Sequence, residues 1–332
     1  MSHETILWIV FAVLVPTVLV LDLGVFQRRA HTIRTKEALL MTAGYVSLAL
    51  IFAVVIYFVM GEEGHDKALT FLTGYIVEWS LSMDNLFVFI LIFTTFAVPS
   101  EHRHRVLFWG IIGAIVTRGI FIATGLTIIE KLEWIIFVFG AFLVYTGLKI
   151  AFKKDQEVDP KKNVFFRLGC KYLPMTDDYR GGKFFSREKG RLLATPLILV
   201  LIVIETTDIV FAVDSIPAIL SITLDSFIVY SSNIFAILGL RALFFALVGL
   251  TNKLVYLSYG LAAILTLLGL KMIFASDLFA ELTGIGIHVP VYASLGAVVG
   301  ILAFSALASF WWPPKKKGIL SNESGVDTEE QK

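Results

Sequence analysis

The sequence has very little cysteine and little charge. Cys170 is the only cysteine among 332 residues, which excludes an intramolecular disulfide, a CxxC redox pair and a multi-thiolate metal site. Charged residues make up 17% of the chain and the formal net charge is +1, so a nucleic-acid-binding footprint is absent. Hydrophobic residues reach 57% and the mean hydropathy is +0.81. This composition predicts a polytopic membrane protein in contact with the lipid bilayer.

Apolar runs long enough to cross a bilayer occur nine times. They are roughly residues 6–26, 38–60, 70–97, 106–128, 134–152, 194–222, 228–250, 255–274 and 288–312. The first run lacks the basic start and the cleavage site of a signal peptide, so we expect it to be retained. The predicted fold class is therefore all-α, with about nine transmembrane helices.

Basic and acidic loops alternate along the chain. Loops around Arg28, Arg103 and Lys253 and the stretch 153–191 are basic, whereas loops around Glu62 and 277–281 are acidic. By the positive-inside rule, the N-terminus is predicted to lie outside and the C-terminus in the cytoplasm.

The longest predicted cytoplasmic segment is the loop 153–193. Residues 160–172 have the pattern of a basic amphipathic helix on the membrane surface, and residues 183–193 that of a short hairpin. Partner proteins would bind through this loop, and the sequence names none. The polar tail 313–332 is predicted to be disordered.

Acidic and amide residues lie inside two of the predicted spans. The six are Glu78, Asp84 and Asn85 in the third span and Glu205, Asp208 and Asp214 in the sixth. An acid at a helix centre costs roughly 2.5–3.5 kcal/mol, so five uncompensated acids cost on the order of 12–18 kcal/mol. Their oxygens are the ligands that Mg²⁺, Ca²⁺ and Mn²⁺ prefer, so these six residues are predicted to form a metal site.

Five further residues are predicted to support this site. Met83 is a soft donor that favours Mn²⁺, and Ser215 is the small polar residue after Asp214. Arg118 and Arg241 are predicted counter-charges or gates, and Asp22 has an interfacial or helix-end role beside Arg28.

An internal repeat organises the spans. A shift of 130 residues places Glu78 on Asp208 and Asp84 on Asp214, and Gly147-Leu-Lys149 recurs as Gly269-Leu-Lys271. The two three-helix units have opposite topology, as in many secondary transporters. The predicted domains are 1–66 (two accessory helices), 67–152 (first repeat), 153–193 (cytoplasmic loop), 194–275 (inverted second repeat), 276–312 (C-terminal helix) and 313–332 (tail).

Proline suggests that one acid-bearing helix is irregular. Pro217 removes the hydrogen bond to the carbonyl of Val213, so we expect a kink or an opening beside Asp214. A break near Met83 is the corresponding expectation for the first half.

Other readings of the acids remain open. They can pair with Arg118 and Arg241 as structural locks. The GxGD signature of an intramembrane aspartyl protease and the HExxH of a metalloprotease are both missing, so no enzyme is expected. Transport of an oxyanion such as tellurite would need a surplus of arginine at the site. Export of a basic amino acid would fit the acids but would need a roomier cavity. A non-transporting scaffold acting in tellurium or metal stress would tolerate loss of the acids.

Two segments resemble the paired signatures of TerC-type integral membrane proteins. They are Glu78-Trp-Ser-Leu-Ser-Met-Asp84-Asn85 and Glu205-Thr-Thr-Asp208-Ile-Val-Phe-Ala-Val-Asp214-Ser-Ile-Pro217, and the stretch Phe235-Ala-Ile-Leu-Gly-Leu-Arg241 also fits. The family is named for tellurium resistance and is similar in repeat plan to the lysine-exporter superfamily. The resemblance implies a Mn²⁺ exporter of the bacterial inner membrane, with the six site residues as its functional positions. The transported species would be Mn²⁺ and protons, with no tightly bound cofactor.

Overall fold

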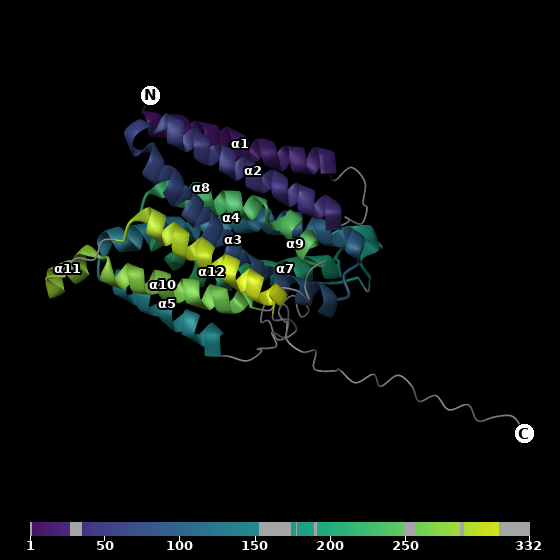
Figure 1. The fold of residues 1–332 in the computed structure, drawn as a ribbon. Helices are drawn as coiled ribbons and strands as arrows, with labels where there is room; N and C mark the ends of the chain where they lie inside the picture. Colours follow the sequence, from purple (N-terminus) through teal and green to yellow (C-terminus); the bar gives the residue numbers. More distant parts are fainter. Residues whose placement is uncertain are drawn as a thin grey trace, which may run out of the picture.

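The protein is an all-α polytopic membrane protein. The computed structural model describes residues 2–26, 35–152, 174–176, 178–188, 191–248, 256–285 and 289–311. Within this part of the chain, eight helical segments are long and apolar enough to cross a membrane. The long helices run roughly side by side as a bundle (Figure 1). The helices of the bundle are α1 (His3–Phe26), α2 (Thr35–Val59), α3 (Gly64–Thr95), α4 (Ser100–Lys131), α5 (Ile135–Phe152), α7 (Pro196–Leu220), α8 (Ser226–Leu238), α9 (Leu240–Val248), α10 (Leu257–Phe274) and α12 (Val291–Trp311). Helices α8 and α9 together form one of the eight segments, and α10 is too short to be counted among them.

Two predicted spans differ in detail from the structure. The seventh is divided at Gly239 into α8 and α9. The eighth corresponds to α10, whose apolar part, Ser258–Phe274, is shorter than the other spans. A short helix that was not predicted, α11 (Asp277–Thr283), follows α10. Ser276 caps its first turn by accepting from Phe279 N, and Gly284 ends it with a φ of 72°, a conformation that glycine adopts without strain.

The predicted hairpin is confirmed. Strand β1 (Phe185–Glu188) pairs antiparallel with β2 (Arg191–Ala194), with Phe185 opposite Ala194. Two one-turn helices, η1 (Gly61–Glu63) and η3 (Arg180–Gly182), precede α3 and β1 respectively. The predicted surface helix 160–172 and the tail 313–332 lie outside the described residues.

Contacts between loops group them at two ends of the bundle. At one end Lys67 Nζ lies 3.4 Å from Glu63 Oε2 and 3.1 Å from Asp225 Oδ2. At the other end Arg105 Nη1 donates to the carbonyl of Gly182 at 2.7 Å, and the Tyr179 hydroxyl donates to the carbonyl of Phe96. The acidic loop residues thus meet at one end and the hairpin lies at the other, and the orientation of the two ends in the membrane stays a prediction.

Helices α5 and α10 lie side by side and approach closely at glycines (Figure 1). A Cβ atom on Gly147 would lie 2.7 Å from the carbonyl oxygen of Ala262, and one on Gly269 would lie 2.6 Å from that of Gly140. A shift of 122 residues converts the first contact into the second. This reciprocity is what an inverted repeat requires, although the repeat itself stays a prediction.

The expected opening of the acid-bearing helices is wrong, whereas a kink at Pro217 stays a prediction. Helix α7 continues through Pro217 to Leu220, and α3 continues past Met83 to Thr95. Pro217 is buried, and its own carbonyl accepts from Ser221 N at 2.9 Å, so the helix resumes its hydrogen bonds directly after the proline. Packing of α7 against α3 and α4 holds the helix across the missing bond.

Candidate functional site

The polar centre of the bundle is the guanidinium of Arg118 on α4. Its side chain is 1% exposed, and Glu78 on α3 and Asp208 on α7 are also buried. Nη1 donates to Glu78 Oε1, and the two other nitrogens form a fork on Asp208, with Nη2 3.2 Å from Oδ1 and Nε 3.4 Å from Oδ2. Nη1 also lies 3.3 Å from the hydroxyl oxygen of Ser215. Arg118 therefore joins one acid from each predicted repeat.

Glu78 has two further partners. Ser82 Oγ donates to its Oε1 at 3.3 Å, and Asn233 Nδ2 on α8 donates to its Oε2 at 2.9 Å. Both of these side chains are fully buried. The carboxylate thus accepts bonds from α3, α4 and α8. Removing one partner of such a buried ion pair typically costs about 3–5 kcal/mol, because the other charge is left uncompensated.

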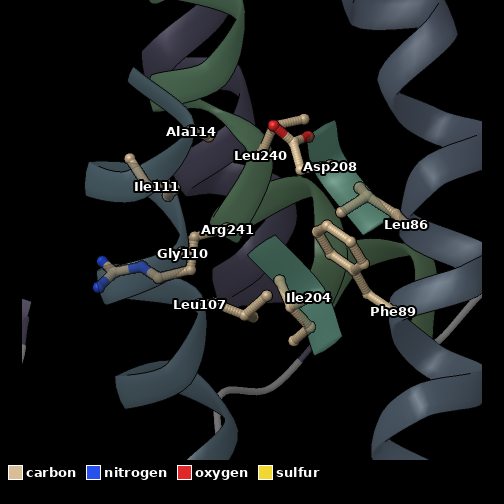
Figure 2. A pocket seen from close by; sticks show the side chains of 10 residues that line it. All are labelled: Leu86, Phe89, Leu107, Gly110, Ile111, Ala114, Ile204, Asp208, Leu240 and Arg241. Atoms are coloured by element: carbon tan, nitrogen blue, oxygen red, sulfur yellow. The ribbon is translucent and has the colours of Figure 1, made fainter. Parts of the chain in front are cut away.

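A small cavity adjoins Asp208. It has a volume of about 20 Å³, which is enough for one water molecule or a bare ion. Its walls come from four helices (Figure 2), and the lining residues are Leu86, Phe89, Leu107, Gly110, Ile111, Ala114, Ile204, Asp208, Leu240 and Arg241. Arg241 is 3% exposed, and its guanidinium points away from the Asp208 carboxylate in this view. Asp208 is the one acidic residue among those that line this space.

Apolar layers enclose the charged groups. Along α4, Arg118 stands one turn from Ala114 on one side and from Ile122 on the other, and these two residues belong to different apolar clusters. Along α7, Asp208 lies in the same way between Ile204 and Ala212. Arg118 and Asp208 are thus separated from both ends of the bundle by packed side chains.

Glu205 and Asp214 are both on α7, and their contacts are with residues other than Arg118. The Glu205 carboxyl group lies against Gly113 of α4, where a Cβ atom would overlap all three of its terminal atoms. Asp214 Oδ1 accepts from Thr146 Oγ1 of α5 at 3.3 Å. Both acids are half-buried. A glycine and a threonine of the first predicted repeat therefore accommodate acids of the second.

The other predicted site residues make no contact with Arg118 that the structure describes. Asn85 is 7% exposed, and Met83 packs on the apolar cluster around Phe89 and Phe93. Asp84 is in α3 and Asp22 in α1, but their side chains are outside the described part of the structure. Among the described residues no three His, Cys, Asp or Glu side chains are gathered closely enough to hold a metal ion. The six-residue metal site stays a prediction.

Sequence reasoning missed Asn233, Thr146 and Gly113. Asn233 could have been found, because it is an amide inside the predicted seventh span, 228–250. Thr146 and Gly113 carry no comparable signal, since small residues are common in membrane helices.

Comparison with known proteins identifies the family to which the chain belongs. Residues 63–317 match the family described as Integral membrane protein TerC family. The chain belongs to the TerC family. It is 44% identical to "Uncharacterized membrane protein STKORF319" of Myxococcus xanthus over 91% of both chains. It is 43% identical to "Putative membrane-bound redox modulator Alx" of Escherichia coli K12, over 92% of this chain and 94% of that one. The protein of the same name from Photorhabdus laumondii is 41% identical, and no solved structure matches.

Proposed function

We propose that this TerC-family protein is a secondary transporter that exports a divalent cation, Mn²⁺ first among the candidates, in exchange for protons. The observation that carries the proposal is the meeting of Glu78 and Asp208 at Arg118 inside an apolar bundle. Charged residues at this depth are costly, and in membrane proteins they commonly mark ion pathways. The carboxylate, amide and hydroxyl oxygens around them are ligands for a hard divalent cation.

The small cavity supports loading from the cytoplasm. It extends from Asp208 along α4 and α7 toward Leu107 and Ile204, on the side of the bundle where the hairpin docks. That end carries the basic loops and is predicted to be cytoplasmic. A cation entering from this side would reach Asp208 before Glu78. We place the protein in the bacterial inner membrane, with the N-terminus outside, as part of the same proposal.

The name of the Alx relatives suggests a redox role. The present chain has Cys170 as its one cysteine, so a dithiol–disulfide cycle within one chain is excluded. Metal export can alter the redox state of a cell without a thiol in the transporter. We therefore favour transport over direct redox chemistry, and expect no enzymatic activity.

Flux measurements on the purified protein test the proposal. Lipid vesicles containing the chain should release or take up Mn²⁺ when a pH gradient is imposed, with opposite proton movement. Glu205→Gln and Asp214→Asn should reduce the flux strongly, whereas Glu62→Gln, an exposed acid outside the bundle centre, should match the parent. Flux in the two variants equal to that of the parent would refute a role of these acids in transport, and absence of flux in the parent would refute transport and favour the scaffold reading.

A further inference from the structure

The Arg118 guanidinium stands where a cation would bind between two buried carboxylates. We propose that it is a tethered counter-ion, which the transported cation displaces and which returns when the cation leaves. The inference rests on the proposed cation transport. It adds that Arg118 occupies the site while no transported cation is bound. Arg118 contacts Glu78, both oxygens of Asp208 and Ser215, so it fills the positions from which these groups would bind a metal.

Charge balance favours exchange over simultaneous binding. Glu78 and Asp208 together carry two negative charges, and Arg118 leaves the group at −1. A divalent cation in place of the guanidinium would neutralise both carboxylates. Without either cation, two buried carboxylates would lie uncompensated in an apolar surrounding, which is strongly unfavourable. Arg118 thus allows the cation-free protein to change conformation.

Asn233 is an independent sign that a ligand binds beside Glu78. Its side chain is fully buried, and because Nδ2 donates to the carboxylate, Oδ1 faces elsewhere. Among the residues that the structure describes, Oδ1 has no hydrogen-bond partner. A buried acceptor of this kind is unfavourable unless something binds it, and an amide oxygen is a common ligand of divalent cations.

Glu205 offers a place for the displaced charge. It lies one turn from Asp208 on α7 and against α4, the helix that carries Arg118. Within the described residues no ion pair engages its carboxylate. A guanidinium that leaves Asp208 therefore has a second acid on the same pair of helices.

Mn²⁺ titration of the purified full chain by calorimetry tests the inference. If Arg118 competes with the cation, Arg118→Gln should bind Mn²⁺ more tightly than the parent, by about tenfold or more, which corresponds to about 1.4 kcal/mol. Exchange of Mn²⁺ across vesicles should nevertheless slow, because the empty form lacks its counter-ion. Arg103→Gln is the matched control, since it removes an arginine from the same helix whose contacts are the Val98 carbonyl and the Phe93 ring. It should bind as the parent does.

Weaker or unchanged Mn²⁺ binding in folded Arg118→Gln would make Arg118 a structural lock and overturn the inference. If that variant does not fold, Arg118→Lys decides, because an ammonium keeps the charge but cannot form the fork on Asp208. It should bind Mn²⁺ more tightly than the parent, and failure to do so overturns the inference. A parent that binds no Mn²⁺ refutes the transport proposal itself, which is a distinct result.

Discussion

Substitution of Gly113 by alanine tests whether the position of the Glu205 carboxylate matters for Mn²⁺ binding and transport. The added Cβ would lie closer than 3.0 Å to the Cδ, Oε1 and Oε2 atoms of Glu205. Because these atoms end a flexible side chain, the carboxylate should move away while α4 and α7 stay in contact. An alanine in a helix gains about 0.5–1 kcal/mol over glycine, and overpacking costs about 1–3 kcal/mol. The net loss of stability should therefore be at most about 2.5 kcal/mol.

The relative loss of Mn²⁺ binding in Gly113→Ala should exceed its relative loss of stability. A charge-assisted contact contributes about 1.5–3 kcal/mol, so displacing the Glu205 carboxylate should weaken Mn²⁺ binding at least about tenfold. Calorimetric titration and thermal unfolding of the same purified sample separate the two effects. Gly119→Ala is the control, because a Cβ at Gly119 of α4 has no atom within 4 Å. Unchanged binding and flux in Gly113→Ala would show that the position of Glu205 is irrelevant to the site.

Three further predictions concern separate contacts. Asn233→Leu should weaken Mn²⁺ binding about tenfold by removing the amide oxygen, while Asn233→Asp retains binding. Equal affinities of all three proteins in calorimetry would contradict a role of Asn233 as a ligand. Gly269→Ala should lower thermal stability by about 1–3 kcal/mol, because its Cβ would lie 2.6 Å from the carbonyl oxygen of Gly140. Gly296→Ala should not, because a Cβ at Gly296 has no atom within 4 Å. Similar melting curves of the two variants would refute close packing at Gly269. Burial raises the pKa of Tyr179, so docking of the hairpin segment should persist through about pH 10 and be lost as the pH rises through that raised pKa. Limited proteolysis should detect this alkaline step, and Tyr179→Phe should abolish it. An identical step in both proteins would argue against a role of Tyr179.

Much of the fold could be predicted because bilayer crossing imposes a simple requirement. A helix that satisfies its own backbone in lipid needs a long apolar run, and such runs are visible in the sequence. The division at Gly239 was missed because the residues from Ser226 to Val248 together are apolar enough for one span. The opening at Pro217 was overpredicted because local chemistry does not include the helices that pack against α7.

The candidate site could be predicted in composition but not in pairing. Burial of Glu78 and Asp208 follows from their place in apolar helices. Arg118 was predicted as a counter-charge, but the two acids that it joins were not, because Arg118 lies 40 residues from one and 90 from the other. The partner Asn233 lies 155 residues from Glu78 and was missed. Contacts over such distances depend on how the helices cross, which residue periodicity alone leaves undetermined.

The order of the helices along the chain has a consequence for biosynthesis. When α5 has left the ribosome, the nascent chain contains Glu78 and Arg118, but Asp208 and Asn233 are still to be made. The early half therefore enters the membrane with its polar groups only partly matched. Release from the insertion machinery should wait until α7 and α8 arrive, so chains truncated before Asp208 should be preferred targets of membrane proteolysis.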